Sequence, residues 1–276
     1  FKTLNDAGVI IAASGDRGRA LELLQKGVQL APQDPTVNYN LARVFYDAGQ
    51  IDDAQSRLQA ALTQQPQFVE AQILQANIDI GKSNYAAAAG AIQNVLKDHP
   101  NVAEAQIAAG VALIGQGKVD EAIRNFERAK ELAPDDAIAS YNLGVAYQDK
   151  NDLNRAKSFY EEAIAKDPEL AEAHNNLGTI LAAQGDLARS FEEFHKAFEL
   201  KPDDATFTKN LSGVVTGEKE LEDKLVGDWE YGTGAMRIWG TVDGKSVSHS
   251  MSVPLQAKLK IVKTGNGEYQ VSDQAA

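Results

Sequence analysis

Three asparagines, Asn142, Asn176 and Asn210, stand at equal intervals in the second half of this chain of 276 residues. An asparagine carboxamide carries a hydrogen-bond donor and an acceptor, so it can pair with both the N–H and the C=O of an extended peptide. If the regular spacing places the three amides on one surface, they can bind peptide backbone irrespective of side-chain sequence. Alternatively, each amide bonds the neighbouring structural unit and only supports the fold. The sequence leaves both interpretations open.

Residues that could do covalent or metal chemistry are scarce. The four histidines, His99, His174, His195 and His249, form no HExxH pair, and there is no cysteine. The sequence also lacks a GxSxG nucleophile motif, a GxxxxGK[ST] phosphate loop and a dinucleotide fingerprint. We therefore expect a protein that is not an enzyme and that uses no metal or cofactor.

The prolines show which elements must position the asparagines. Six of the eight prolines are evenly spaced, at the same interval as the asparagines. A constant period of this length indicates one structural unit copied in tandem. The six are Pro32, Pro66, Pro100, Pro134, Pro168 and Pro202.

Small and large residues also recur within each unit. Position 8 is small, position 20 is alanine or serine, and position 24 is large and apolar, as in Gly144, Ala156 and Tyr160 of the fifth unit. Spacings of three and four place such residues on one helix face, and the small ones allow two helices to approach closely. Between the two halves, Gly15, Gly49, Gly117 and Gly185 suit a turn with positive φ. Each unit is therefore predicted to be helix, tight turn, helix, ended by the proline.

This pattern resembles the tetratricopeptide repeat. The fifth copy matches best and the third departs most, with Gln75 and Asp79 at two core positions and Ser83 at the turn. We expect the first helix of the third copy to be shifted so that Ile73, Ile78 and Ile80 fill the core. The matching residues of the fifth copy are Leu143, Gly144, Tyr147, Ala156, Tyr160, Ala163 and Pro168.

The resemblance implies an all-α, right-handed superhelical solenoid. The repeats are predicted at residues 1–34, 35–68, 69–102, 103–136, 137–170 and 171–204, with a capping helix at 205–225. After residue 226 the sequence alternates in twos, and Asp243-Gly244 and Asn266-Gly267 are typical hairpin turns. We expect residues 226–276 to form a small antiparallel β module, either complete or the start of a longer domain. It would contain both tryptophans, Trp229 and Trp239.

In tetratricopeptide arrays the first helices line a concave groove, and the resemblance implies that this groove holds a segment of another protein. Position 6 carries the asparagines, which resemble the asparagine ladder of O-linked N-acetylglucosamine transferases. The cations of the clamp that grips chaperone C-termini are missing, so an Hsp70 or Hsp90 receptor is not expected. The tyrosines are potential anchors, and the middle of the groove is apolar. The predicted groove residues are Tyr39, Asn40, Arg43, Tyr46, Leu74, Asn77, Ile107, Val111, Tyr141, Asn142, Asn175, Asn176, Thr179, Lys209 and Asn210.

The net charge of −12 argues against nucleic acid as a partner, because phosphates reward clustered Lys and Arg. No apolar run is long enough for insertion into a membrane. The acidic excess lies in the helical part, where Asp34, Asp136 and Asp204 suit helix caps. An acidic surface that attracts a basic partner is the alternative. The chain begins at Phe1, which indicates a processed or trimmed N-terminus and leaves a cytoplasmic and an exported location open.

The sequence thus favours a non-catalytic scaffold that binds an extended or helical segment of a partner protein. Two alternatives stay open at this point. One is self-assembly of the array through its acidic face and its β segment. The other is a ligand-binding β module, for example one in which a saccharide stacks on Trp229 or Trp239.

Overall fold

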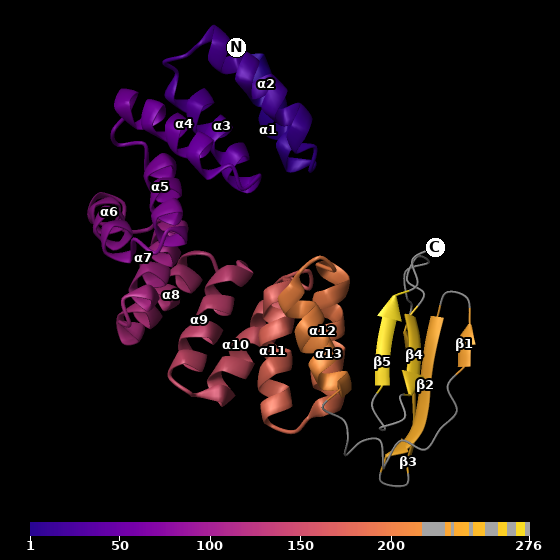
Figure 1. Cartoon of the computed structure of the whole chain (residues 1–276). Helices are drawn as coiled ribbons and strands as arrows, with labels where there is room; N and C mark the ends of the chain where they lie inside the picture. Colours follow the sequence, from indigo (N-terminus) through magenta and orange to yellow (C-terminus); the bar gives the residue numbers. More distant parts are fainter. Residues whose placement is uncertain (217–229, 233–234, 243–244, 252–258, 264–268, 274–276) are drawn as a thin grey trace. The chain divides into compact units, whose positions relative to one another are not determined.

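The computed structural model describes residues 1–216 and, beyond them, 230–232, 235–242, 245–251, 259–263 and 269–273. These residues divide into two compact units, Phe1–Ala173 and His174–Ala276. Thirteen α-helices run through the described part of the chain from the N-terminus (Figure 1). Among the described residues, no helix has the length and apolar character needed to cross a bilayer.

The helices alternate between first and second members of a repeat, as predicted. From α3 onward both series begin at the interval that separates the prolines, so each repeat is a helix, a tight turn and a second helix. The first helices are α1 (Lys2–Ala13), α3 (Pro35–Asp47), α5 (Val69–Gly81), α7 (Ala103–Gly115), α9 (Ala137–Asp149), α11 (Ala171–Ala183) and α13 (Ala205–Thr216). The second helices are α2 (Arg17–Leu30), α4 (Ile51–Gln64), α6 (Tyr85–Asp98), α8 (Val119–Leu132), α10 (Leu153–Lys166) and α12 (Leu187–Leu200).

The turn between the two helices has one left-handed residue in every repeat. Four of the six are glycines, at φ angles between 72° and 92°, which confirms the prediction for these turns. The other two are Ser83 (φ 61°) and Asn151 (φ 58°). A side chain at positive φ is strained, although asparagine tolerates this region better than serine does.

Close helix packing inside a repeat depends on a small residue facing a large one. In the fifth repeat, a Cβ added to Gly144 would lie 2.5 Å from the ring of Tyr160, which is fully buried. Gly178 stands in the same relation to Phe194. The predicted pairing of positions 8 and 24 is therefore the basis of the core within a repeat.

The isoleucines expected in the core of the third repeat lie there, since Ile73 and Ile78 are buried and Ile80 packs against the core, but the helix is not shifted to place them. Helix α5 keeps the register of the other first helices and divides its apolar residues between two neighbours. Leu74 and Ile78 pack into the core of the first two repeats, whereas Ile73 and Ala76 join the core shared with the fourth repeat. Because isoleucines occupy both flanks of α5, the helix keeps its packing without moving along its axis.

The connections that precede α3, α9 and α13 each end in an aspartate. The side chains of Asp34, Asp136 and Asp204 accept hydrogen bonds from backbone N–H groups in the first turns of α3, α9 and α13. These bonds satisfy donors that a helix cannot pair internally. The capping interpretation is therefore confirmed for these three acids.

Among the described residues, five strands follow α13. Strands β1 (Glu230–Gly232), β2 (Ala235–Val242) and β3 (Lys245–Met251) form one antiparallel sheet, and β4 (Leu259–Lys263) pairs antiparallel with β5 (Tyr269–Asp273). Trp239 pairs with Ser248 in this register. Trp229, the two predicted turn pairs and the predicted boundary at 225/226 lie outside the described residues. The all-α repeat array is the established fold class, and a separate β module stays a prediction.

Candidate protein-binding surface

The side of each first helix that carries positions 2, 5, 6, 9 and 12 is called here the first-helix face. Thirteen of the fifteen predicted groove residues keep exposed surface on it. Leu74 and Asn175 are the exceptions, each 7% exposed, and Leu74 packs into the core of the first two repeats. Arg43, Thr179 and Lys209 are exposed, whereas Tyr39, Asn40, Tyr46, Asn77, Ile107, Val111, Tyr141, Asn142, Asn176 and Asn210 are partly buried.

Two of the position-6 asparagines bond the preceding repeat. The Asn40 amide donates to Asn5 Oδ1 at 2.8 Å, and the Asn210 amide donates to Asn175 Oδ1 at 2.7 Å. Both acceptors occupy position 5 and are buried. The acceptor asparagine in turn donates to position 6 of its own repeat, which is Asp6 in one case and Asn176 in the other. At these two junctions the amides support the packing of adjacent first helices.

Asn142 behaves differently because its neighbour at position 5 is Ile107, which offers no acceptor. Its amide donates to the carbonyl of Ile138 at 2.8 Å, within its own helix. Sequence reasoning did not anticipate this difference. The signal was available, since asparagines at position 5 of one repeat and position 6 of the next occur at Asn5/Asn40 and at Asn175/Asn210 but not in the middle of the array.

Two predicted residues meet in a hollow of about 470 Å³ between the second and third repeats. Tyr46 of α3 and Asn77 of α5 line it together with Ile51, Ile78, Gly81 and Lys82. The Lys82 ammonium donates to Gln55 Oε1 at 2.7 Å. The hollow therefore combines apolar walls with the Asn77 carboxamide, the Tyr46 hydroxyl and the hydrogen-bonded Lys82 ammonium.

Tyr39, in the second repeat, interacts electrostatically with acidic residues of the third and fourth repeats. Its ring lies 5.0 Å from that of Phe68. Burial raises the pKa of the Tyr39 hydroxyl, the charge and hydrogen bond of Arg43 lower it, and the charges of Glu70 and Glu104 raise it further. Both glutamates occupy position 2 of their repeats and are exposed. Their carboxylates thus act on the same part of the surface as Tyr39.

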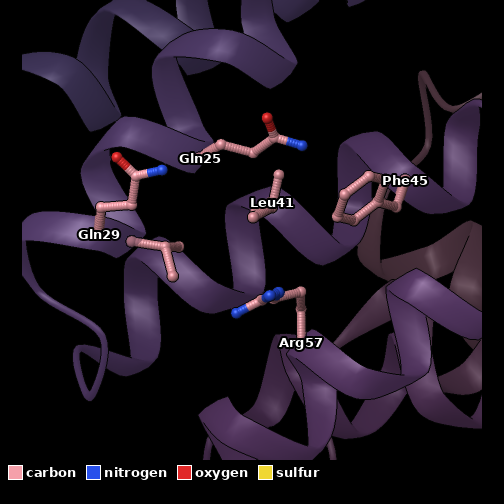
Figure 2. Close-up of a pocket in the computed structure, with 6 residues that line it drawn as sticks. Gln25, Gln29, Leu41, Phe45 and Arg57 are labelled. Carbon is pink, nitrogen blue, oxygen red and sulfur yellow. The ribbon is translucent and has the colours of Figure 1, made fainter.

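A second hollow, of about 230 Å³, lies between α2, α3 and α4 and is lined by none of the fifteen predicted residues. Figure 2 shows Gln25 above Leu41, Gln29 and Phe45 on opposite sides of it, and Arg57 below. Leu41 and Phe45 belong to the buried core, so the floor of this hollow is the packing layer between repeats.

Position 4 has a role that sequence reasoning missed. The amides of Asn38, Gln72 and Gln106 donate to the carbonyl groups of Pro32, Pro66 and Pro100, at 2.9, 2.7 and 3.1 Å. Each of these hydrogen bonds joins a first helix to the connection that precedes it. The absence of the family tryptophan at position 4, together with polar residues three times in a row, was the available signal.

The fifth repeat has a polar network instead at this position. Ser140 is fully buried and donates to Glu162, which also pairs with Lys130 at 2.6 Å and with Lys166 at 2.9 Å. Burial alone would raise the pKa of Glu162, but the hydrogen bonds and charges of the two lysines outweigh it and hold the pKa below its ordinary value. Within the described residues, no three His, Cys, Asp or Glu side chains gather as potential metal ligands.

Comparison with known proteins decides the family. Three family models described as tetratricopeptide repeat match residues 12–78 and 113–177, residues 73–137, and residues 171–204. The chain belongs to the tetratricopeptide repeat family. Members of this family are generally protein–protein interaction scaffolds and are typically non-catalytic. None of the curated proteins matches the chain.

Solved tetratricopeptide structures share the fold at low sequence identity. The Cut9–Hcn1 hetero-tetramer of the APC/C matches 77% of this chain with a TM-score of 0.70 at 16% identity, and the match spans 42% of that chain. A tetratricopeptide repeat protein from Parabacteroides merdae matches 77% of this chain and 83% of its own, with a TM-score of 0.67 at 20% identity. PilW, a type IV pilus biogenesis factor, matches 76% of this chain and 97% of its own, with a TM-score of 0.64 at 17% identity.

Proposed function

We propose that this tetratricopeptide array is a non-catalytic scaffold that binds a segment of a partner protein along its first-helix face. The observation that carries the proposal is the hollow where Tyr46 and Asn77 meet, and α7, which packs against α5, adds Ile107 and Val111, both only partly buried. A hollow with apolar walls and a few polar groups suits a peptide side chain, and partly buried apolar residues on the neighbouring first helix extend the contact. Cut9 was solved within a hetero-tetramer, which is consistent with a scaffold of this fold.

The test uses a random dodecapeptide phage library panned against the full chain. We expect peptides that bind the wild type but lose at least tenfold in affinity for the double variant Ile107→Ser/Val111→Ser. The matched control is Ala86→Ser/Ala87→Ser on the second helix α6, where both positions are exposed. Circular dichroism checks that all variants keep their helix content. If no peptide is enriched, or if selected peptides bind the Ile107/Val111 variant as well as the wild type, the proposed function is wrong.

We further propose that Asn142 contributes a backbone contact to the bound segment. Its amide is engaged with its own helix in the hydrogen bond described above, whereas Asn40 and Asn210 bridge two repeats. Alanine at Asn142, Asn176 and Asn210 together should weaken peptide binding, and Asn142→Ala alone should account for much of the loss. Asn154→Ala on α10 is the control, since Asn154 is exposed on a second helix. Unchanged affinity of the triple variant would refute the asparagine ladder.

Residues 226–276 are proposed to form a separate β module that caps the array or makes a second contact. The antiparallel pairing of β2 with β3 and of β4 with β5 supports this proposal. Limited proteolysis tests it. A stable fragment that begins between residues 217 and 229 is expected, whereas progressive digestion through β1–β5 would contradict a folded module.

A further inference from the structure

The face of α7 that follows Glu104 is apolar over its whole length. Ile107, Val111 and Ile114 occur at spacings of four and three residues and are all partly buried. Between Ala105 and Gly115 the helix has no charged residue. A partner segment that lies on this face must therefore offer apolar side chains to cover it.

The two helices that form this apolar face carry only acidic charges, and the nearest cation named above, Arg43 of α3, is hydrogen-bonded to the Tyr39 hydroxyl. Helix α7 packs beside α5, and neither helix contains a lysine, an arginine or a histidine. Their three charged residues are Glu70, Asp79 and Glu104, and Asp79 accepts a hydrogen bond from Gln75 at 3.3 Å. The two glutamates are exposed, and both act on the hydroxyl of Tyr39. First-turn acids also stabilise their own helices, but the same position holds Thr36 in α3 and Ile138 in α9, so the fold does not require an acid there.

Together these residues define an acidic–apolar strip, made of Tyr39, Glu70, Glu104, Ile107, Val111 and Ile114. We propose that this strip binds a partner segment in which an arginine or lysine is flanked by apolar side chains. The proposal rests on the proposed function and adds the chemistry of the partner. The basic side chain lies beside Glu70 and Glu104, and the apolar ones cover α7.

Arginine fits this strip better than lysine. A guanidinium donates two parallel hydrogen bonds to a carboxylate, a geometry that the ammonium group of lysine does not offer. An acidic segment would bring like charges together, which disfavours binding. A second copy of this chain is disfavoured for the same reason, because the protein has a net charge of −12.

The test uses the peptides selected from the random dodecapeptide library. The expected result is that wild-type binders are enriched in arginine and lysine next to apolar residues. A synthetic selected peptide should bind Glu70→Gln/Glu104→Gln at least tenfold more weakly than the wild type, and its binding to the wild type should weaken as salt rises from about 50 to about 500 mM. The matched control is Glu121→Gln/Glu127→Gln, which removes the same charge from exposed positions of α8, one of them also in a first turn.

The outcomes separate this inference from the proposed function. Peptides that need Ile107 and Val111 but lack basic residues, or that bind the Glu70/Glu104 variant unchanged, would overturn the inference and keep the proposed function. Peptides that bind the Ile107/Val111 variant as well as the wild type would overturn both. A wild-type dimer that sedimentation detects, and that Ile107→Ser/Val111→Ser abolishes, would assign the strip to self-association and would also overturn the inference.

Discussion

The third and fifth repeats have the same helix–turn–helix backbone, but their side chains pack differently. In the fifth repeat, Tyr160 fills the space above Gly144 and its hydroxyl donates to Gln148 at 2.8 Å. Its charges are paired: Arg155 lies over the Tyr147 ring, and Glu162 pairs with Lys166 and with Lys130 of the fourth repeat. In the third repeat, α5 gives its apolar residues to two neighbouring cores and has Gln75 and Asp79 at consensus core positions.

This difference shows what the departures from the consensus do. The fifth repeat keeps most consensus residues, and its polar side chains pair with one another or with Lys130 of the fourth repeat. The third repeat departs further from the consensus and still folds, because its neighbours supply the packing, and its first helix exposes the Glu70 carboxylate. Local rules are often broken where a protein functions, and the departures in α5 are consistent with the binding surface proposed there.

The largest effect is expected for a substitution in the core of the fifth repeat. Gly144→Ala forces the Tyr160 ring to move, and overpacking of this kind costs about 1–3 kcal/mol. Gly90→Ala is the matched change in the third repeat, where nothing lies within 4 Å of the added Cβ. It should gain about 0.5–1 kcal/mol because glycine is a poor helix former. Urea denaturation followed by circular dichroism measures both, and equal shifts of the two midpoints would contradict the contrast.

A second prediction concerns the Glu162 network in the fifth repeat. Because the folded-state pKa of Glu162 is depressed, its stabilisation is present above the unfolded pKa of about 4.3 and disappears as the pH falls through the folded value. Glu162→Gln should therefore cost about 1 kcal/mol at pH 7 and nothing measurable near pH 3. Glu127→Gln, at an exposed position of α8, is the control and should cost little at either pH. A cost for Glu162→Gln that does not change with pH would show that the lysines do not act on this carboxylate.

The smallest effect is expected in the two turns whose left-handed residue is not glycine. Ser83→Gly in the third repeat should raise stability by about 0.5–1 kcal/mol, since serine is strained at φ 61°. Asn151→Gly in the fifth repeat should change it by only a few tenths of a kcal/mol, because asparagine tolerates this conformation. Thermal midpoints measured under identical conditions test the order of the two, and a larger gain for Asn151→Gly would reverse the argument.

Much of the fold was predictable because its determinants are periodic. The prolines, the small residues at positions 8 and 20 and the turn glycines recur with one constant period, and the helices of the structure follow them. The registration of α5 was predicted wrongly, because Gln75 and Asp79 were read as evidence of a shift. Pairwise partners were harder to predict: whether Asn142 bonds a neighbour depends on Ile107 in the preceding repeat, and the polar residues at position 4 bond the proline carbonyls before them.

The most direct test of the account is hydrogen exchange of the full chain with and without a library-selected dodecapeptide. Binding along the first-helix face predicts slower exchange in α5 and α7, which hold all of the acidic–apolar strip except Tyr39, and unchanged exchange in α10. Protection confined to the second helices, or to residues 226–276, would contradict the central claim that α5 and α7 hold the partner.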